Sequence, residues 1–109
     1  EQAGDTYLAV DNVSLVPEKF ALHHNHPNPF NPITSLGYDL PEQAQVTLTI
    51  YNLMGREITQ LVNTTQDAGY RSVQWNATDM HGKPVSAGVY LYQIQAGEFV
   101  QTRKMVLLK

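Results

Sequence analysis

Apolar residues in this sequence recur at every second position far more often than with the 3.6-residue period of a helix. The clearest case is the segment 46–51, Val-Thr-Leu-Thr-Ile-Tyr, in which Val, Leu and Ile take one side and the other three residues take the opposite side. Such a segment is typical of a strand with one face on a core and the other in water. The sequence therefore predicts an all-β chain with little or no helix.

Further strands are predicted where similar segments are bounded by Gly, Pro, Asn or Asp. These segments are 34–40, 57–62, 70–76, 89–96 and 99–108. Gly55, Gly82 and Gly97 lie between them in short polar stretches that indicate tight turns. Many short strands at this spacing favour an antiparallel β-sandwich of about seven strands. Segment 89–96 is apolar on both faces at its start, which predicts a central strand.

The first part of the chain differs from the rest. Residues 7–16 read as one long strand, and Pro17 and a proline-rich passage over residues 23–32 follow it. Around Asp11-Asn12-Val13 the sequence resembles the closing strand of carbohydrate-binding jelly rolls. We therefore expect residues 1–17 to be the end of a preceding domain or an extra N-terminal strand, and residues 18–109 to form the sandwich. A strand-swapped homodimer is one arrangement that such a detached strand allows.

Composition excludes several classes of protein. The chain has 109 residues, enough for one domain with its own core, and no cysteine for a disulfide, a thiolate metal site or a nucleophile. Its formal net charge is −3 and it has no basic run, so a nucleic acid partner is not expected. It contains neither an apolar stretch of the ~20 residues that a membrane helix needs nor an N-terminal signal peptide.

A series of motifs along residues 18–109 resembles one known family. It opens with Asn28-Pro29-Phe30-Asn31-Pro32-Ile33-Thr34. Tyr38-x-Leu40-Pro41-Glu42, Val46-x-Leu48-x-Ile50-Tyr51-Asn52-x-x-Gly55 and Ala68-Gly69-Tyr70-x-x-Val73-x-Trp75 follow in order. The last are Gly82-x-Pro84-Val85-x-x-Gly88-Val89-Tyr90-x-Tyr92 and Lys104-Met105-Val106-Leu107-Leu108-Lys109. The sequence is similar in this pattern to the type A C-terminal sorting domains of the type IX secretion system, which themselves resemble the immunoglobulin-like domain of the flagellar hook-cap protein.

This resemblance implies an immunoglobulin-like sandwich that serves as an address tag without catalytic activity. The implied partners are a covalently linked upstream cargo domain, the outer-membrane translocon and a sortase-like peptidase. The implied location is the cell surface or the medium, reached through the periplasm. We expect recognition to involve Gly88, Val89, Tyr90, Lys104, Met105, Val106, Leu107 and Lys109.

The final segment has two interpretations on its residues alone. A translocon or peptidase could read its edge by strand addition. Alternatively, Lys104 and Lys109 guard an edge strand against aggregation. For the core we expect Ile50, Val73 and Trp75, with Trp75 between the two sheets rather than stacked on a ligand.

No cofactor or native metal site is expected. His23, His24 and His26 lack the spacing of structural zinc sites and have no cysteine partner, so a solvated connector is the favoured interpretation. Oxygen ligands for calcium are present without EF-hand spacing, at Asp5, Asp11, Asn63, Asp67, Asn76 and Asp79. The motifs of common hydrolases and nucleotide-binding enzymes are missing from the sequence.

Two other functions stay open on the sequence. One is a structural immunoglobulin-like scaffold or adhesion module. The other is a carbohydrate-binding accessory domain, which would need exposed aromatic side chains. The candidates for that role are Tyr7, Tyr38, Tyr51, Tyr70, Tyr90 and Tyr92.

Overall fold

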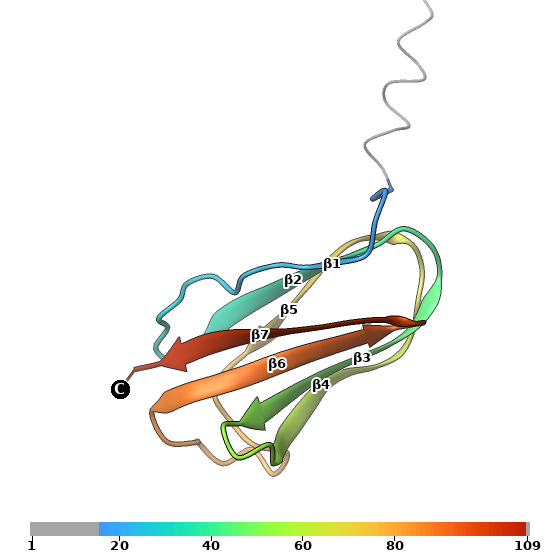
Figure 1. Cartoon of the computed structure of the whole chain (residues 1–109). Coiled ribbons are helices and arrows are strands. Elements are labelled where there is room, and N and C mark those ends of the chain that lie inside the picture. Colours follow the sequence, from blue (N-terminus) through green and yellow to red (C-terminus); the bar gives the residue numbers. More distant parts are fainter. Residues whose placement is uncertain (1–15, 109) are drawn as a thin grey trace, which may run out of the picture.

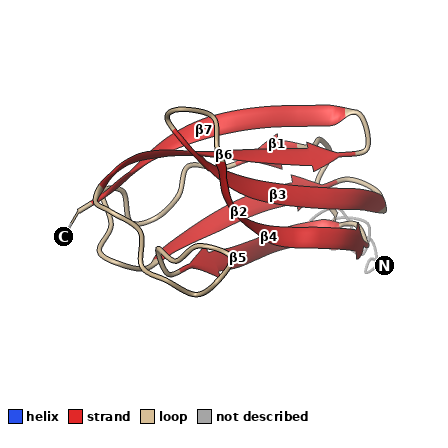
Figure 2. Ribbon diagram, turned by 90° about the horizontal axis from the view of Figure 1, so that it is seen from below, coloured by secondary structure: helices blue, strands red, loops and turns tan. Residues whose placement is uncertain are grey.

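Two antiparallel β-sheets face one another in this chain (Figures 1 and 2). The structure is a computed structural model that describes residues 16–108. One sheet has the order β1-β2-β5, formed by β1 (Ala21–Leu22), β2 (Thr34–Leu40) and β5 (Gly69–Trp75). The other has the order β4-β3-β6-β7, formed by β3 (Ala44–Asn52), β4 (Glu57–Gln66), β6 (Gly88–Ala96) and β7 (Phe99–Leu107). The predicted all-β sandwich of about seven antiparallel strands is confirmed.

The largest difference from the predicted boundaries is at β4, which continues to Gln66 instead of ending at residue 62. Its last residues are polar and carry no apolar alternation, so the sequence pattern gives no sign of a strand there. They are held by their pairing with the start of β3, where Ala44 lies opposite Gln66. The side chain of Gln45 adds hydrogen bonds to Asn63 (3.1 Å) and Thr65 (3.0 Å).

The segment before β2, residues 16–33, is called the lead-in and is more ordered than the sequence suggests. It contains the two-residue strand β1, which pairs with β2 and was not predicted. His23 N–H donates to Gly37 O (2.9 Å), and His26 and Ser35 exchange backbone hydrogen bonds (3.0 and 2.9 Å). The predicted strand over residues 7–16 lies outside the described residues except for Val16. Within the described range no helix is long and apolar enough to cross a membrane.

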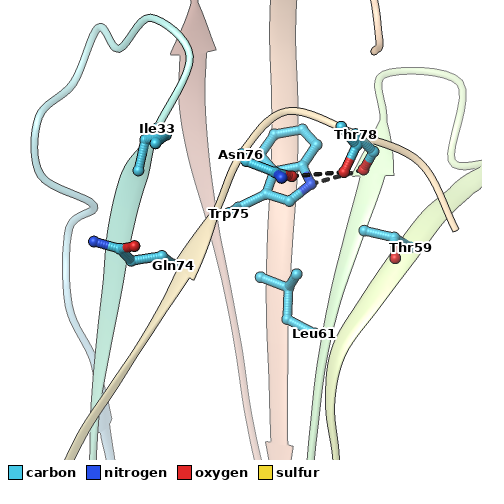
Figure 3. A pocket seen from close by; sticks show the side chains of 7 residues that line it. All are labelled: Ile33, Thr59, Leu61, Gln74, Trp75, Asn76 and Thr78. Atoms are coloured by element: carbon cyan, nitrogen blue, oxygen red, sulfur yellow. Dashed lines mark hydrogen bonds between the residues drawn. The ribbon is translucent and has the colours of Figure 1, made fainter. Parts of the chain in front are cut away.

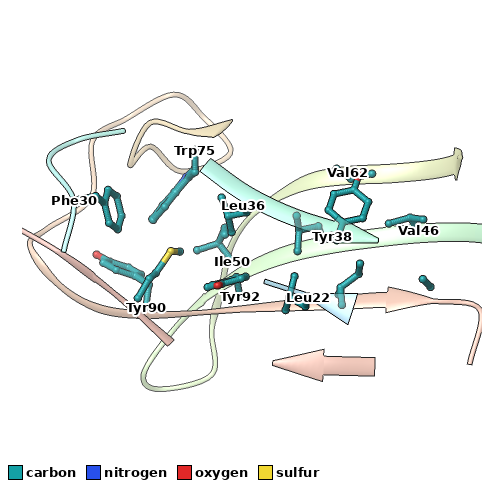
Figure 4. Close-up of a cluster of buried hydrophobic side chains, with 14 of the residues drawn as sticks. Leu22, Phe30, Leu36, Tyr38, Val46, Ile50, Val62, Trp75, Tyr90 and Tyr92 are labelled. Carbon is teal, nitrogen blue, oxygen red and sulfur yellow. The ribbon is translucent and has the colours of Figure 1, made fainter. Parts of the chain in front are cut away.

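Alternate residues of the strands fill the space between the sheets (Figure 4). On the central strand β6, Tyr92, Ile94 and Ala96 are fully buried, as its apolar character predicts. The side chain of Ile50 is 0% exposed and that of Trp75 is 1% exposed, and Val73 is partly buried against the same core. Burying a side chain of this size stabilises the fold by about 1.5–3 kcal/mol.

Two buried tyrosines place their hydroxyl groups against polar partners at the edges of this core. Tyr38 donates to Gln66 Oε1 (2.6 Å), and Tyr92 donates to the carbonyl of His23 (2.7 Å). A tyrosine can therefore fill the core without leaving a polar atom unpaired. The first bond joins β2 to the end of β4 in the other sheet, and the second joins β6 to the lead-in.

We expect the domain to lose stability as the pH rises above about 10. Burial raises the pKa of Tyr38, Tyr90 and Tyr92, because it penalises the phenolate form. A group whose folded pKa is raised stabilises the fold fully below its unfolded pKa, and this contribution is lost as the pH rises through the folded pKa. Urea denaturation at several pH values between about 9 and 11 measures the effect. Tyr92→Phe should reduce the pH dependence, and a midpoint that does not change with pH would contradict the prediction.

Candidate recognition site at the C-terminal strand

The structure brings the two predicted groups of recognition residues together at one end of the sandwich. The start of β6 pairs with the end of β7, so that Gly88 lies opposite Leu107, Val89 opposite Val106 and Tyr90 opposite Met105. Lys104 directly precedes Met105 on β7 and lies opposite Leu91. Lys109 lies outside the described residues.

The Asn-Pro-Phe-Asn-Pro motif lies against this same end of β7. Phe30 N–H donates to Val106 O (3.0 Å), and Leu108 N–H donates to Phe30 O (2.9 Å). The side chain of Asn28 accepts a hydrogen bond from Val106 N–H at its Oδ1 (3.0 Å). We call Asn28, Phe30, Val106 and Leu108 the C-terminal clamp. Through it, the motif that opens the domain holds the last strand on its outer edge.

Aromatic packing anchors the clamp in the core. The side chain of Phe30 is 2% exposed, and its ring centroid lies 5.9 Å from that of Trp75. The ring of Trp75 in turn meets Tyr90 edge to face, with centroids 5.4 Å apart. Such tilted and edge-to-face contacts add about 0.5–1.5 kcal/mol to the burial itself. Phe30 therefore connects β7, in one sheet, to Trp75 of the other sheet.

A small polar network fixes the path of the chain into the clamp. The buried side chain of Asn25 donates to Thr34 Oγ1 (3.0 Å), and the Thr34 hydroxyl donates to Pro27 O (2.8 Å). This explains why Thr34, the last residue of the motif, has a fixed position although it makes no contact in the clamp. In contrast, Pro29, Asn31 and Pro32 are exposed.

Not all expected recognition residues are accessible in the folded domain. Tyr90, Met105 and Leu107 are buried, at 7%, 0% and 1% exposure, and they cannot contact a partner without unfolding. Lys104 is exposed and Val106 is partly exposed. The accessible side chains along this end of β7 are those of Lys104, Val106 and Leu108, beside the exposed side chain of Asn28.

Gly88 is needed for its backbone conformation. Its φ is +148°, a value that residues with a side chain rarely adopt. A Cβ placed there would meet no atom within 4 Å, so space is not the constraint. This conformation lets the chain leave the β5–β6 loop and enter the ladder opposite Leu107.

The other half of β7 is held to β1 by side chains. Arg103 Nε donates to Leu22 O (2.6 Å), and Leu22 N–H donates to Gln101 Oε1 (3.3 Å). The N–H and the C=O of Val106 both point to the lead-in. Because the direction of the backbone groups alternates along an antiparallel strand, those of Lys104 and Thr102 point to the same outer edge of β7. β7 is the last strand of its sheet, so these backbone groups lie on a sheet edge.

Among the residues considered as metal ligands, His23, His24 and Asp79 have other partners, while Asp5 and Asp11 lie outside the described residues. His23 Nε2 pairs with Asp39 Oδ1 (2.9 Å), and His24 Nε2 lies 3.2 Å from Arg103 Nη1. Asp79 accepts from the backbone N–H groups of His81 (2.8 Å) and Lys83 (3.0 Å), and these bonds lower the pKa of its carboxyl group. In residues 16–108, no three His, Cys, Asp or Glu side chains gather so that they could hold a metal ion.

The fold and its strand order can be compared with known families. Residues 32–98 match the FlgD Ig-like domain. The chain belongs to the FlgD Ig-like domain family. The match covers β2 to β6 of this Ig-like domain and ends before β7, so it includes neither Asn28 and Phe30 nor the strand that they hold. No curated protein sequence matches the chain significantly.

Solved structures with the same fold include two proteins of Porphyromonas gingivalis. Dimeric latent PorU superposes with a TM-score of 0.66 at 16% identity, covering 84% of this Ig-like domain and 10% of PorU. PorZ, a surface component of the type IX secretion system, gives 0.56 at 19% identity, covering 84% and 12%. FlgD of P. aeruginosa gives 0.54 at 20% identity, covering 85% and 74%. The chain thus spans about a tenth of PorU and of PorZ, and at these identities the likeness concerns the fold.

Proposed function

We propose that this Ig-like domain is a non-catalytic sorting module that directs a covalently linked upstream protein through the type IX secretion system to the cell surface. The observation that supports this most is the C-terminal clamp. Its two halves come from the two motifs that resemble the opening and closing motifs of type A sorting domains, and Asn28 and Val106 are 78 positions apart in the sequence. PorZ adds support, since it is a surface component of that system and a part of it has the same fold.

In this proposal the partner reads a folded edge rather than a loose peptide. The clamp holds the end of β7 in one conformation, so little ordering entropy is lost when a partner binds. Thr102 and Lys104 offer peptide groups for strand addition, and the Lys104 ammonium adds a charge that selects an acidic partner surface. The outer-membrane translocon and a sortase-like peptidase are the partners proposed for this edge.

Export of a reporter protein tests the proposal. The reporter carries a secretory signal and this chain at its C-terminus, in a bacterium with a type IX system. We expect Lys104→Glu to lower the surface fraction by about tenfold or more, since it reverses a charge at the proposed contact. Lys83→Glu is the matched control, because Lys83 is also exposed but lies in the β5–β6 loop. Accessibility of the reporter to added protease on intact cells measures the surface fraction.

Retention of the unmodified, folded fusion in the periplasm would contradict the sorting role. Equal surface fractions of the two lysine variants would contradict the proposed contact at Lys104. Truncation from Lys104 onward is a poor test, because it also removes the buried Met105 and Leu107 and would unfold the domain.

A structural scaffold is the second candidate function. It is favoured by the family match, which covers β2 to β6 and does not include the clamp. In that case the charge of Lys104 protects the edge strand β7 against aggregation. Retention of the folded, unmodified fusion in the periplasm would favour this role.

A further inference from the structure

The four edge strands of the sandwich differ in how they are protected. β1 has two residues, and Leu22 in it is already bonded to Gln101 and Arg103. β7 carries Arg103 and Lys104 and is covered by the clamp at one end. On β5, Arg71 is tied to Asp67 O by two hydrogen bonds (3.1 and 2.9 Å). β4 has ten residues, and after its first residue, Glu57, it contains no charged side chain and no proline.

One backbone group on the outer edge of β4, the carbonyl of Ile58, accepts a hydrogen bond from outside the sheet. Met80, in the β5–β6 loop, donates its N–H to Ile58 O (3.1 Å). At Ile58 the outer edge of β4 is therefore already occupied by the loop. The register of β4 against β3 shifts twice, between Leu48 and Thr49 and between Ile50 and Tyr51. Such shifts twist an edge locally, and the stretch that pairs regularly with β3 begins at Val62.

A pocket of about 350 Å³ lies beside β4, between it and β5 (Figure 3). Its lining residues are neutral: Ile33, Thr59, Leu61, Gln74, Trp75, Asn76 and Thr78. The indole N–H of Trp75 donates to Thr78 O (2.9 Å) and its ring is 1% exposed, so Trp75 forms a wall of the pocket and offers no face for stacking. Hydroxyl and amide groups with an apolar wall suit a ligand that is polar but uncharged.

We propose that the outer edge of β4 and this pocket together bind an extended, uncharged peptide segment of another protein. An added strand would lie about 4.8 Å outside β4, and its inward-facing side chains would enter the space toward β5. Backbone hydrogen bonds would supply affinity, and the pocket would select the side chain. A charged side chain would find no counter-charge among the lining residues and would lose its hydration.

This site is separate from the C-terminal clamp. β4 and β7 are the opposite edges of the four-stranded sheet, with β3 and β6 between them. A peptide on β4 therefore leaves β7 free, and the site can be filled whether or not the domain acts in sorting.

Nuclear magnetic resonance of the ¹⁵N-labelled full chain tests the proposal. The probe is the peptide acetyl-Ser-Thr-Val-Thr-Val-Thr-Ser-amide. We expect its addition to shift the backbone signals of β4 from Thr59 to Gln66 and the indole signal of Trp75. Gln74→Lys, which places a charge at the pocket, should weaken binding by about tenfold or more. The matched control Gln95→Lys changes an exposed residue of β6 away from the pocket and should leave binding unchanged.

Three results would overturn the proposal. The first is no shift at millimolar peptide, and the second is shifts confined to the outer edge of β7. The third is equal binding of a peptide with lysine at the three threonine positions, whose polar, uncharged side chains suit the pocket. Because Gln74 is exposed, its variant keeps the core intact, and the signal dispersion of the same spectra verifies that it is folded.

Discussion

Phe30→Ala is expected to lower the free energy of unfolding by about 3–5 kcal/mol. The substitution removes a buried ring that contacts Trp75, and it leaves a cavity between the lead-in and β7. Urea denaturation followed by tryptophan fluorescence measures the change. Leu53→Ala is the control, since that side chain is 64% exposed and its loss should change stability by less than about 0.5 kcal/mol.

The same variant should loosen the end of β7 in particular. Leu108 N–H donates to the Phe30 carbonyl, so its hydrogen exchange should accelerate more than that of amides in the central strand β6. A stability loss below about 1 kcal/mol, or equal acceleration in all strands, would show that Phe30 does not anchor the clamp.

Trp75→Ala is expected to cost a similar amount, about 3–5 kcal/mol. Trp75 is the one tryptophan of the chain, is 1% exposed and contacts both Phe30 and Tyr90. Trp75→Phe should cost less, because it keeps an aromatic ring and loses the indole bond to Thr78 O. Circular dichroism is the measurement, since these variants lack the fluorescent side chain.

The two substitutions should not be additive. Phe30 and Trp75 are in contact, so the double variant is expected to differ from the sum by about 0.5–3 kcal/mol. Additivity within error would contradict the aromatic packing that anchors the clamp, and a Trp75→Phe variant as unstable as Trp75→Ala would place its main contribution in the hydrogen bond.

The sandwich combines one closed side and one open side. On the side of β1 and β7, Gln101, Arg103 and the clamp join the two sheets through hydrogen bonds to backbone groups. On the side of β4 and β5, the sheets separate around a pocket. The closed side presents the surface proposed for sorting, and the open side presents the one proposed for peptide binding.

Much of the fold can be predicted from the sequence, because it depends on local chemistry. Alternation over residues 46–51 sets the buried face of β3, where Val46, Leu48 and Ile50 are all 0% exposed. Gly55 and Gly82 have φ values of +83° and +79°, as expected for the predicted turns. Strand 34–40 was predicted with the bounds that β2 has. The polar end of β4 and the short β1 were missed, because long-range pairing rather than residue pattern holds them in the sheet.

The sequence by itself determined that this chain forms a β-sandwich and which residues alternate into its core, since both follow from a period of two between turn residues. Only the tertiary structure decided that Asn28 and Phe30 grip Val106 and Leu108, and that Tyr90, Met105 and Leu107 are buried. It also decided where β4 and β5 separate to form a pocket. These features depend on which edges meet in space, and such contacts between distant segments leave no periodic signal in a single sequence.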